Sequence, residues 1–311
     1  MIYDCFTFYN ELDLLKIRLE ILNPYVDKFV IVELNKTHRG LNKPLNFQLH
    51  IDEFEKYIDK IIYITPDDIP EYKGDGDWTI ENFQRNSIML GLKGCKPDDI
   101  IMVSDLDEIP APDIFKNSSV KYSLPQLSQV LNSGKKQVVK YIINNVLKAD
   151  YKNKKIIRDG STSWIELLDN NRFVCAQGCF YYYMNCKRND YWFGTTISKF
   201  KNMKSPQNMR NDRTCMLNLE NSGWHFSYLG GVEKIKQKLL SIIDSRKEIN
   251  DRMRKCSEND DYIIYCMKNG ISIFDDVEKE PEYHFIDIKD IGLDNIQEIK
   301  SQYPYFFYEE N

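Results

Sequence analysis

The sequence predicts an α/β fold with a mostly parallel central sheet, helices on both of its faces, and a helical appendage at the C-terminus. Over roughly the first hundred residues, short apolar runs typical of buried strands alternate with segments of helical periodicity. Such strand-helix-strand repetition builds parallel sheets covered by helices. From about residue 245 the chain is charged and then aromatic. We therefore expect two units, residues 1–245 and residues 246–311.

The elements of the first unit follow from local patterns. Residues 2–8 form an apolar and aromatic run, which predicts a buried strand. Leucines recur at helical spacing over residues 12–22, Asn10 is a candidate N-cap, and Pro24 ends the helix. The same criteria predict strands at 29–33, 61–64 and 100–103, and helices at 54–57 and 78–93.

The second half of the chain is less regular. Apolar runs predict strands at residues 138–143, 173–184, 195–200 and 224–228. Helical periodicity predicts helices at 232–243 and 261–267.

Composition excludes several classes of protein. The chain has 311 residues, with 42 Lys plus Arg against 47 Asp plus Glu, a formal net charge of −5. Nucleic-acid binding rests on clustered Lys and Arg, so we expect no nucleic-acid partner. No apolar run approaches the roughly 18 residues of a membrane span, and the N-terminus has no basic, apolar leader. We therefore expect no transmembrane segment and no signal peptide.

Acidic side chains follow the fourth predicted strand. Asp105 and Asp107 come directly after the buried run at 100–103. Side chains two apart in an extended chain point the same way, so both carboxylates face one cleft while Leu106 points to the core. Asn10 and Glu11 follow the first strand and Glu33 ends the second. Because ligands of such sheets bind beyond the carboxyl ends of the strands, these groups should converge.

Two adjacent carboxylates repel each other unless a cation lies between them. Oxygen ligands suit Mg²⁺ or Mn²⁺, which would also bind substrate phosphate oxygens. Asp105 and Asp107 are therefore candidate metal ligands that would neutralise a nucleotide-diphosphate leaving group. The alternative is an ordinary acidic turn before Pro110.

This acidic strand end resembles the metal-binding D-x-D motif of GT-A fold glycosyltransferases, and the chain more narrowly resembles glycosyltransferase family 17. That family contains the β-1,4-mannosyl-glycoprotein 4-β-N-acetylglucosaminyltransferases. The resemblance rests on residues 3–11, 29–33, 81–86, 104–110 and 223–228, with a looser match from 181–183 through 192–195. Together these stretches span about residues 1–245.

The resemblance implies an inverting transfer of N-acetylglucosamine from UDP-N-acetylglucosamine to a mannose hydroxyl, with a divalent metal. Animal members of the family carry a Golgi membrane anchor. Here the catalytic domain begins at residue 1, so we expect a cytoplasmic protein of bacterial or viral type, with a glycan or glycoconjugate as acceptor. Another nucleotide-sugar donor stays open. So does a non-catalytic glycan-binding module, to which the aromatic content would be suited.

The resemblance gives several residues a role at the nucleotide. Glu33 could accept hydrogen bonds from uridine or ribose, or it is a solvated strand-end acid. Asn10 and Glu11 could line the same nucleoside pocket, although Asn10 is nearly as well explained as a helix cap. Arg85 could clamp the diphosphate, or it pairs with Glu81 four residues earlier.

His225 could complete the metal site of Asp105 and Asp107, or it is a core histidine among aromatic side chains. Trp192, Gly194 and Tyr182, from the run at 181–183, are candidates for an acceptor platform. Plain core packing is the alternative, and it should hold for at least one of the three tyrosines, since neighbours in a strand face opposite ways.

An inverting transferase also needs a general base for the acceptor hydroxyl. The first candidate is Glu220, which precedes the segment at 224–228, and Glu166 and Asp190 follow.

Overall fold

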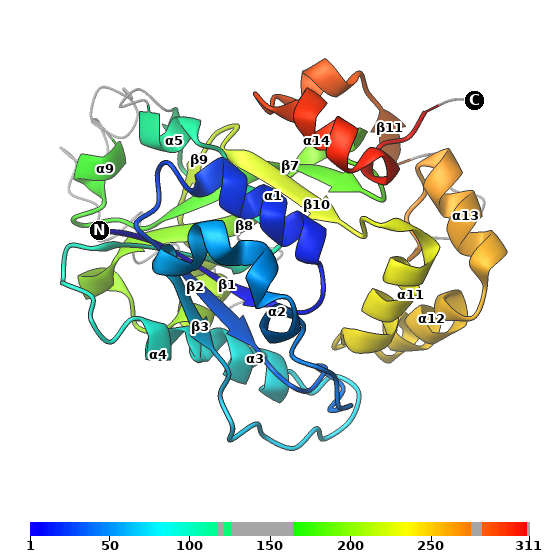
Figure 1. The fold of residues 1–311 in the computed structure, drawn as a ribbon, viewed down its shortest axis with the longest axis horizontal. Coiled ribbons are helices and arrows are strands. Elements are labelled where there is room, and N and C mark those ends of the chain that lie inside the picture. The colour runs from blue at the N-terminus through cyan, green and yellow to red at the C-terminus, as the bar shows by residue number, and fades with distance from the viewer. Residues whose placement is uncertain (117–120, 126–163, 275–281, 310–311) are drawn as a thin grey trace.

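One mixed sheet runs through the centre of the molecule (Figure 1). The computed structural model describes residues 1–116, 121–125, 164–274 and 282–309. The strand order is β3-β2-β1-β4-β8-β7-β10-β5, and β6, β9 and β11 pair at the side of this path. The strands are β1 (Ile2–Phe8), β2 (Lys28–Glu33), β3 (Ile61–Ile64), β4 (Ile100–Asp105), β5 (Glu108–Pro110), β6 (Tyr122–Ser123), β7 (Phe173–Tyr181), β8 (Cys186–Lys199), β9 (Leu217–Leu219), β10 (Gly223–Ser227) and β11 (Tyr283–Phe285).

The sheet has a parallel half and a mixed half. β3, β2, β1 and β4 are parallel, and β8 joins antiparallel to both β4 and β7. β10 runs parallel to β7, and β5 pairs antiparallel with β10. The predicted α/β class is therefore confirmed, and the carboxyl ends of the parallel strands meet at one edge of the sheet as expected.

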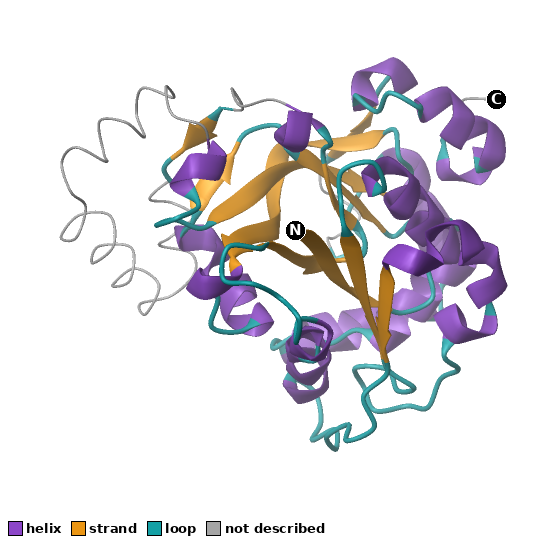
Figure 2. Ribbon diagram, turned by 60° about the vertical axis from the view of Figure 1, so that its left-hand side comes forward, coloured by secondary structure: helices purple, strands orange, loops and turns teal. Residues whose placement is uncertain are grey.

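Helices cover both faces (Figure 2). On β1, Phe6 and Phe8 belong to the larger apolar cluster, beneath α1 and the segment around Phe47 and Phe54. Alternate residues of the same strand, including Cys5, belong to a second cluster beneath α4 and α10. The helices are α1 (Leu12–Leu22), α2 (Asn46–Leu49), α3 (Thr79–Asn86), α4 (Ile88–Gly91), α5 (Asp113–Lys116), α9 (Trp164–Leu167), α10 (Pro206–Asp212), α11 (Gly231–Ser241), α12 (Lys247–Ser257), α13 (Asp260–Asn269) and α14 (Ile296–Gln302).

Several local expectations need correction. The helix predicted over 78–93 is interrupted at Ser87, whose hydroxyl donates to the Phe83 carbonyl at 2.8 Å, a bond that competes with regular helix geometry. Asn10 does not cap α1, because the N-cap residue is Glu11 and no side chain bonds there. The segment 54–57 lies in a 3₁₀ helix, Ile51–Lys60. The strand predicted at 138–143 lies outside the described residues.

The C-terminal part packs in two places. The helices α11, α12 and α13 share one apolar cluster with Tyr182 and Tyr228. β11 packs in a small cluster with Cys179 and Cys186, and the segment 286–307 returns to the main cluster, beside α1. The expected boundary at residue 245 stays a prediction. None of the helices in the part of the chain that the structure describes has the length and apolar character needed to cross a membrane.

Candidate functional site

The carboxyl ends of β1, β2 and β4 open onto a cavity of about 260 Å³, which we call the central cavity. Segments that follow these three strands line it, together with α3, α10, α11 and the end of β10. The cavity brings together six of the residues predicted from the sequence: Glu11, Arg85, Asp105, Asp107, Trp192 and His225.

The carboxylate of Asp105 lies between two guanidinium groups. Its Oδ1 accepts from Arg85 Nη2 at 2.9 Å and its Oδ2 accepts from Arg210 Nη2 at 2.8 Å. Burial alone would raise the pKa of Asp105, but Arg210 and Arg85 hold it well below its usual range. Asp105 is therefore an anion at neutral pH.

Arg85 combines both roles considered for it. One nitrogen, Nη2, donates to Asp105 Oδ1 and to Glu81 Oε1, each at 2.9 Å. Its Nη1 donates to Gln207 at 2.6 Å, and its Nε is buried without a partner. The guanidinium is thus held at the cavity wall with donor capacity left over.

Asp107 also lines the cavity, and Leu106 between the two acids is buried and belongs to the main apolar cluster. Asp107 Oδ2 accepts from Lys238 Nζ at 2.7 Å and lies 3.7 Å from His225 Nε2. Although burial by itself lowers the pKa of His225, the neighbouring Asp107 carboxylate raises it to about 9. His225 is therefore a cation at neutral pH in this arrangement.

Glu108 connects the acidic turn to the stacked rings of Trp192 and His225. Arg210 Nη1 donates to both of its carboxylate oxygens, at 2.6 and 2.7 Å, and Trp192 Nε1 donates to Oε1 at 2.6 Å. The Trp192 ring stacks on His225 with centroids 4.6 Å apart, and the Arg213 guanidinium lies 5.2 Å from the Trp192 ring. Burial and the neighbouring Arg210 lower the pKa of Arg213 to about 9.

A buried arginine fixes the backbone of this acidic turn. Arg18 of α1 forms an ion pair with Asp4 of β1 at 2.6 Å, and both side chains are fully buried. Its Nη1 donates to the carbonyl oxygens of Asp105, Leu106 and Glu108 at 2.9 to 3.1 Å. Arg18 therefore holds the turn in the shape that turns both aspartates toward the cavity.

Two residues expected at the nucleotide lie differently. Glu33 is fully buried, and its oxygens accept from Lys43 Nζ at 2.7 Å, from two backbone N–H groups that begin α2, and from Tyr63. It is Lys43, not Glu33, that lines the central cavity. Asn10 lines the neighbouring cavity described below and donates to Gln237 at 2.9 Å.

The expected acceptor platform is only partly assembled. Trp192 lines the cavity, and Tyr181 does so in place of Tyr182. Tyr182 is fully buried, donates to the Ile271 carbonyl at 2.7 Å and accepts from Ile273 N at 3.0 Å. A Cβ atom on Gly194 would lie 2.0 Å from Gln177 Oε1, so Gly194 permits close packing behind Trp192.

The three candidate bases lie outside the cavity, although their role as such stays untested. Glu220 is exposed in the turn before β10, and Glu166 is exposed on α9. Asp190 is exposed on β8 and pairs with Arg188.

Metal binding by Asp105, Asp107 and His225 also stays a prediction. Over the described ranges, no group of three or more His, Cys, Asp or Glu side chains is arranged to hold a metal ion. The two carboxylates suit a hard divalent cation nonetheless, because Mg²⁺ usually takes one or two carboxylates and completes its shell with water and phosphate oxygens. Among the described residues, Asp107 Oδ1 has no hydrogen-bond partner to displace.

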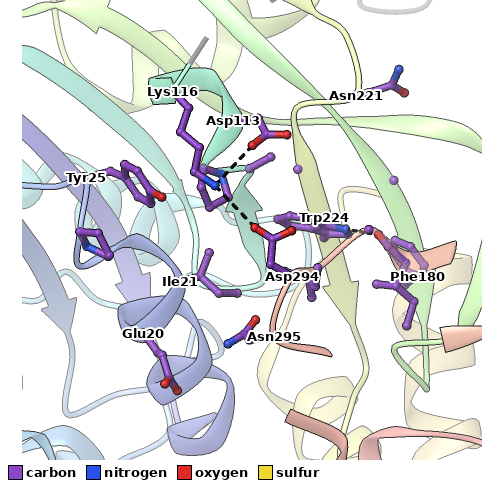
Figure 3. A pocket seen from close by; sticks show the side chains of 18 of the residues that line it. Glu20, Ile21, Tyr25, Asp113, Lys116, Phe180, Asn221, Trp224, Asp294 and Asn295 are labelled. Carbon is purple, nitrogen blue, oxygen red and sulfur yellow. Dashed lines mark hydrogen bonds and ion pairs between the residues drawn. The ribbon is translucent and has the colours of Figure 1, made fainter. Parts of the chain in front are cut away.

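Two further cavities lie nearby. One of about 310 Å³, which we call the flanking cavity, shares Glu11, Asp107, Tyr228 and Lys238 with the central cavity. The other, of about 350 Å³, lies beside β10 and β5 at the sheet edge (Figure 3). None of the site residues predicted from the sequence lines the cavity at the edge, where Lys116 pairs with the exposed Asp113 and Asp294.

The similarity of this chain to known proteins lies in the segment that contains Asp105 and Asp107. Residues 1–125 match the sequence model of Glycosyltransferase family 17, a segment that includes β1 to β5 and the acidic turn. The β-1,4-mannosyl-glycoprotein 4-β-N-acetylglucosaminyltransferases of human and rat are each 34% identical to this chain over 110 residues, and that of mouse is 33% identical. Each match covers 33% of this chain and 20–21% of the relative, so the chain matches about a fifth of the length of these relatives.

These relatives overturn the expected cytoplasmic location of bacterial or viral type. They are mammalian Golgi glycosyltransferases, and their name places the substrate on a mannosyl glycoprotein. The expectation failed because it relied on the start of the chain, which carries no information on where the protein works. The resemblance itself is confirmed: over residues 1–125 this chain matches glycosyltransferase family 17.

Proposed function

We propose that the protein is a glycosyltransferase that moves N-acetylglucosamine from UDP-N-acetylglucosamine to a sugar hydroxyl of a glycan. One observation carries the proposal. Asp105 and Asp107, inside the segment that matches the family, both line a cavity at the carboxyl ends of the parallel strands, facing three cationic side chains.

The cationic groups suit a nucleotide diphosphate. Arg85, Arg210 and Lys238 each donate to a carboxylate of the acidic turn. Phosphate oxygens accept hydrogen bonds from the same donors, and paired guanidinium N–H groups match their geometry. A diphosphate that enters the cavity would therefore compete with the carboxylates for these donors.

A divalent cation would bind the carboxylates, whereas the diphosphate would bind the cationic side chains. We propose that Mn²⁺ or Mg²⁺ binds Asp105 and Asp107, with His225 beside them, when the donor is present. Bound there, the ion would neutralise charge that develops on the leaving diphosphate. The polar groups that follow β2, Thr37 and His38, line the same cavity and are the proposed neighbours of the nucleoside.

The acceptor is proposed from the names of the relatives. They act on a β-1,4-mannosyl glycoprotein, so a β-linked mannose is the first acceptor to test. In an inverting transfer, the acceptor oxygen bonds to the anomeric carbon of N-acetylglucosamine from the face opposite the departing UDP.

Calorimetric titration of UDP-N-acetylglucosamine into the protein tests the donor, first with Mn²⁺ and then with EDTA. UDP-glucose and UDP-galactose serve as competing donors. We expect binding that requires the metal and prefers UDP-N-acetylglucosamine. A protein that binds no UDP-sugar in Mn²⁺ but still binds mannosides would be a glycan-binding module instead.

An Asp105→Asn variant separates the two ways of holding the diphosphate. If the metal holds it, affinity in Mn²⁺ falls by about tenfold or more, which is about 1.4 kcal/mol. If Arg85 and Arg210 hold it directly, affinity in EDTA rises instead, because each guanidinium group loses one of its two carboxylate partners. The control is Asp113→Asn on α5, an exposed residue outside the central cavity, which should leave affinity within about twofold.

A further inference from the structure

The reaction needs a carboxylate that is free to accept a proton, and the ion pairs around the central cavity single one out. Five carboxylates line this cavity, namely Glu11, Glu81, Asp105, Asp107 and Glu108. Asp105 and Glu108 pair with Arg210, Asp107 pairs with Lys238, and Glu81 pairs with Arg85. Among the described residues Glu11 forms no ion pair.

Glu11 is held in place by the backbone beside it. It lies between the end of β1 and the start of α1, and its Oε2 accepts from the Asn10 backbone N–H at 3.0 Å. Its other carboxylate oxygen has no partner among the described residues. A guanidinium or ammonium partner at hydrogen-bond distance would stabilise the anion against protonation. The ammonium groups of Lys43 and Lys238 act on Glu11 only through longer-range charge, so Glu11 is better suited than its four neighbours to accept a proton.

Glu11 also lines the flanking cavity, as do both members of the Asp107–Lys238 ion pair. A group that serves both the donor and the acceptor must stand where their sites meet. Glu11, Asp107 and Lys238 line both cavities and so form the boundary between them.

The flanking cavity has the chemistry of a sugar site. Its wall carries the carboxylates of Asp13 and Glu53 and the amide of Asn10, which can bond to hydroxyl groups. Tyr305 also lines this cavity and is 50% exposed to solvent, and its hydroxyl donates to Asp13 at 2.6 Å. Pyranose rings pack their C–H faces on such aromatic rings while neighbouring polar groups bind the hydroxyls.

We propose that the flanking cavity is the acceptor subsite and that Glu11 is the general base of the transfer. This inference rests on the proposed function. The acceptor hydroxyl gives its proton to the free oxygen of Glu11 while the hydroxyl oxygen bonds to the anomeric carbon of the donor sugar. The bond from that carbon to the β-phosphate oxygen breaks, and its electron pair leaves with UDP.

The test measures UDP release from UDP-N-acetylglucosamine in Mn²⁺, with and without methyl β-D-mannopyranoside, and detects the disaccharide by mass spectrometry. In Glu11→Gln we expect UDP release to fall about 100-fold or more, while the calorimetric affinity for the donor stays within about twofold. Glu11→Asp should recover part of the rate. The wild-type kcat/KM should rise with pH through one ionisation that is missing in Glu11→Gln. Glu20→Gln, an exposed change on the same helix, should behave as wild type.

The acceptor subsite has its own readout. Tyr305→Ala should raise the KM for methyl β-D-mannopyranoside about fivefold and leave donor affinity unchanged, and Tyr305→Phe, which keeps the ring, should raise it less.

The outcomes separate the two claims. If wild-type protein neither binds nor turns over any UDP-sugar, the proposed function and this inference both fail. If wild type is active and Glu11→Gln keeps its rate and its pH profile, the assignment of the base is wrong and the function stands. An unchanged mannoside KM in Tyr305→Ala overturns the subsite.

Discussion

Replacing Arg18 with methionine should cost more stability than any surface change, because Arg18 connects the core to the acidic turn. Its guanidinium donates six hydrogen bonds, to Asp4, to Ser104 and to three backbone carbonyls of the turn. Methionine has an unbranched apolar side chain like the arginine stem, but it is two atoms shorter and has no donor. The substitution therefore removes the charge and the hydrogen bonds while filling most of the space.

The magnitude follows from what is left behind. Asp4 is fully buried and would keep its charge without a partner, a situation that costs about 3–5 kcal/mol. The carbonyls of Asp105, Leu106 and Glu108 would each lose a charged donor, and bonds of this kind are worth about 1.5–3 kcal/mol before overlap between the terms is allowed for. We expect a loss of about 4–6 kcal/mol, which approaches the whole stability of many domains.

Urea unfolding followed by tryptophan fluorescence and circular dichroism measures this loss. The control is Lys16→Met on the same helix, where Lys16 pairs with Glu53 at the surface and the change should cost less than about 1 kcal/mol. The double variant Asp4→Leu with Arg18→Met removes the orphaned charge and should be more stable than Arg18→Met alone. A loss below about 1 kcal/mol in Arg18→Met, or no difference between the single and the double variant, would refute the reasoning.

Three further predictions concern the rest of the fold. The pKa of His225 is raised to about 9 from an unfolded value of about 6.5. Its pairing with Asp107 therefore stabilises the fold fully below about pH 6.5, and this contribution is lost as the pH rises through 9. The difference in unfolding free energy between wild type and His225→Gln should shrink between about pH 6 and 10. Tyr182→Phe leaves the buried Ile271 carbonyl and Ile273 N–H without their partner and should cost about 1–3 kcal/mol in urea unfolding. A chain that ends at residue 245 should show no cooperative unfolding, because six buried apolar side chains between 291 and 307, each worth about 1.5–3 kcal/mol, would be missing from the main cluster.

Each of these three has an outcome that counts against it. If the stability difference between wild type and His225→Gln does not change with pH, the pairing with Asp107 does not raise the pKa of His225. If Tyr182→Phe leaves the free energy of unfolding unchanged, water replaces the hydroxyl as the partner of the two backbone groups. A sharp unfolding transition of the shortened chain would make residues 1–245 an independent unit, as the sequence suggested.

The parallel half of the sheet was predictable because its signals are local. The apolar run at 2–8 and the run before Asp105 are long enough to define buried strands, and the acids at the carboxyl ends of these strands are therefore expected at the cavity. Asp105 and Asp107 do line the cavity and Leu106 is buried, but the strand period does not set these directions. β4 ends at Asp105, Leu106 and Asp107 form a turn, and the hydrogen bonds from Arg18 fix that turn.

The partners of the acidic turn were not predictable in the same way. Arg210 and Lys238 lie on helices more than one hundred residues along the chain, and neither stands in a motif. Arg18 did carry a signal, since it lies three residues after Leu15 and four before Leu22, on the buried stripe of its helix. A charged residue on an apolar stripe needs a buried partner, and Asp4 on the neighbouring strand was the available one.

Glu220, the first candidate base in the sequence, lies outside the central cavity for a geometric reason. Glu220 was chosen for its closeness in sequence to His225. A strand advances about 3.3 Å per residue, so a residue in the turn before β10 lies far from the end of that strand, where the cavity is. Closeness in sequence along an extended chain is a poor guide to closeness in space.

The return of the C-terminal segment to the first helix has a consequence during synthesis. Apolar residues between 286 and 307 complete the apolar cluster that α1 begins, and Tyr305 bonds to Asp13 at the start of that helix. At about 5–20 residues per second, the ribosome needs roughly 15–60 s to reach this segment after α1 has emerged. Throughout that interval the nascent chain exposes apolar surface that belongs to the core. We expect this surface to be covered by a chaperone, or by slow collapse of the chain onto its other segments, until the aromatic segment 303–307 has been synthesised.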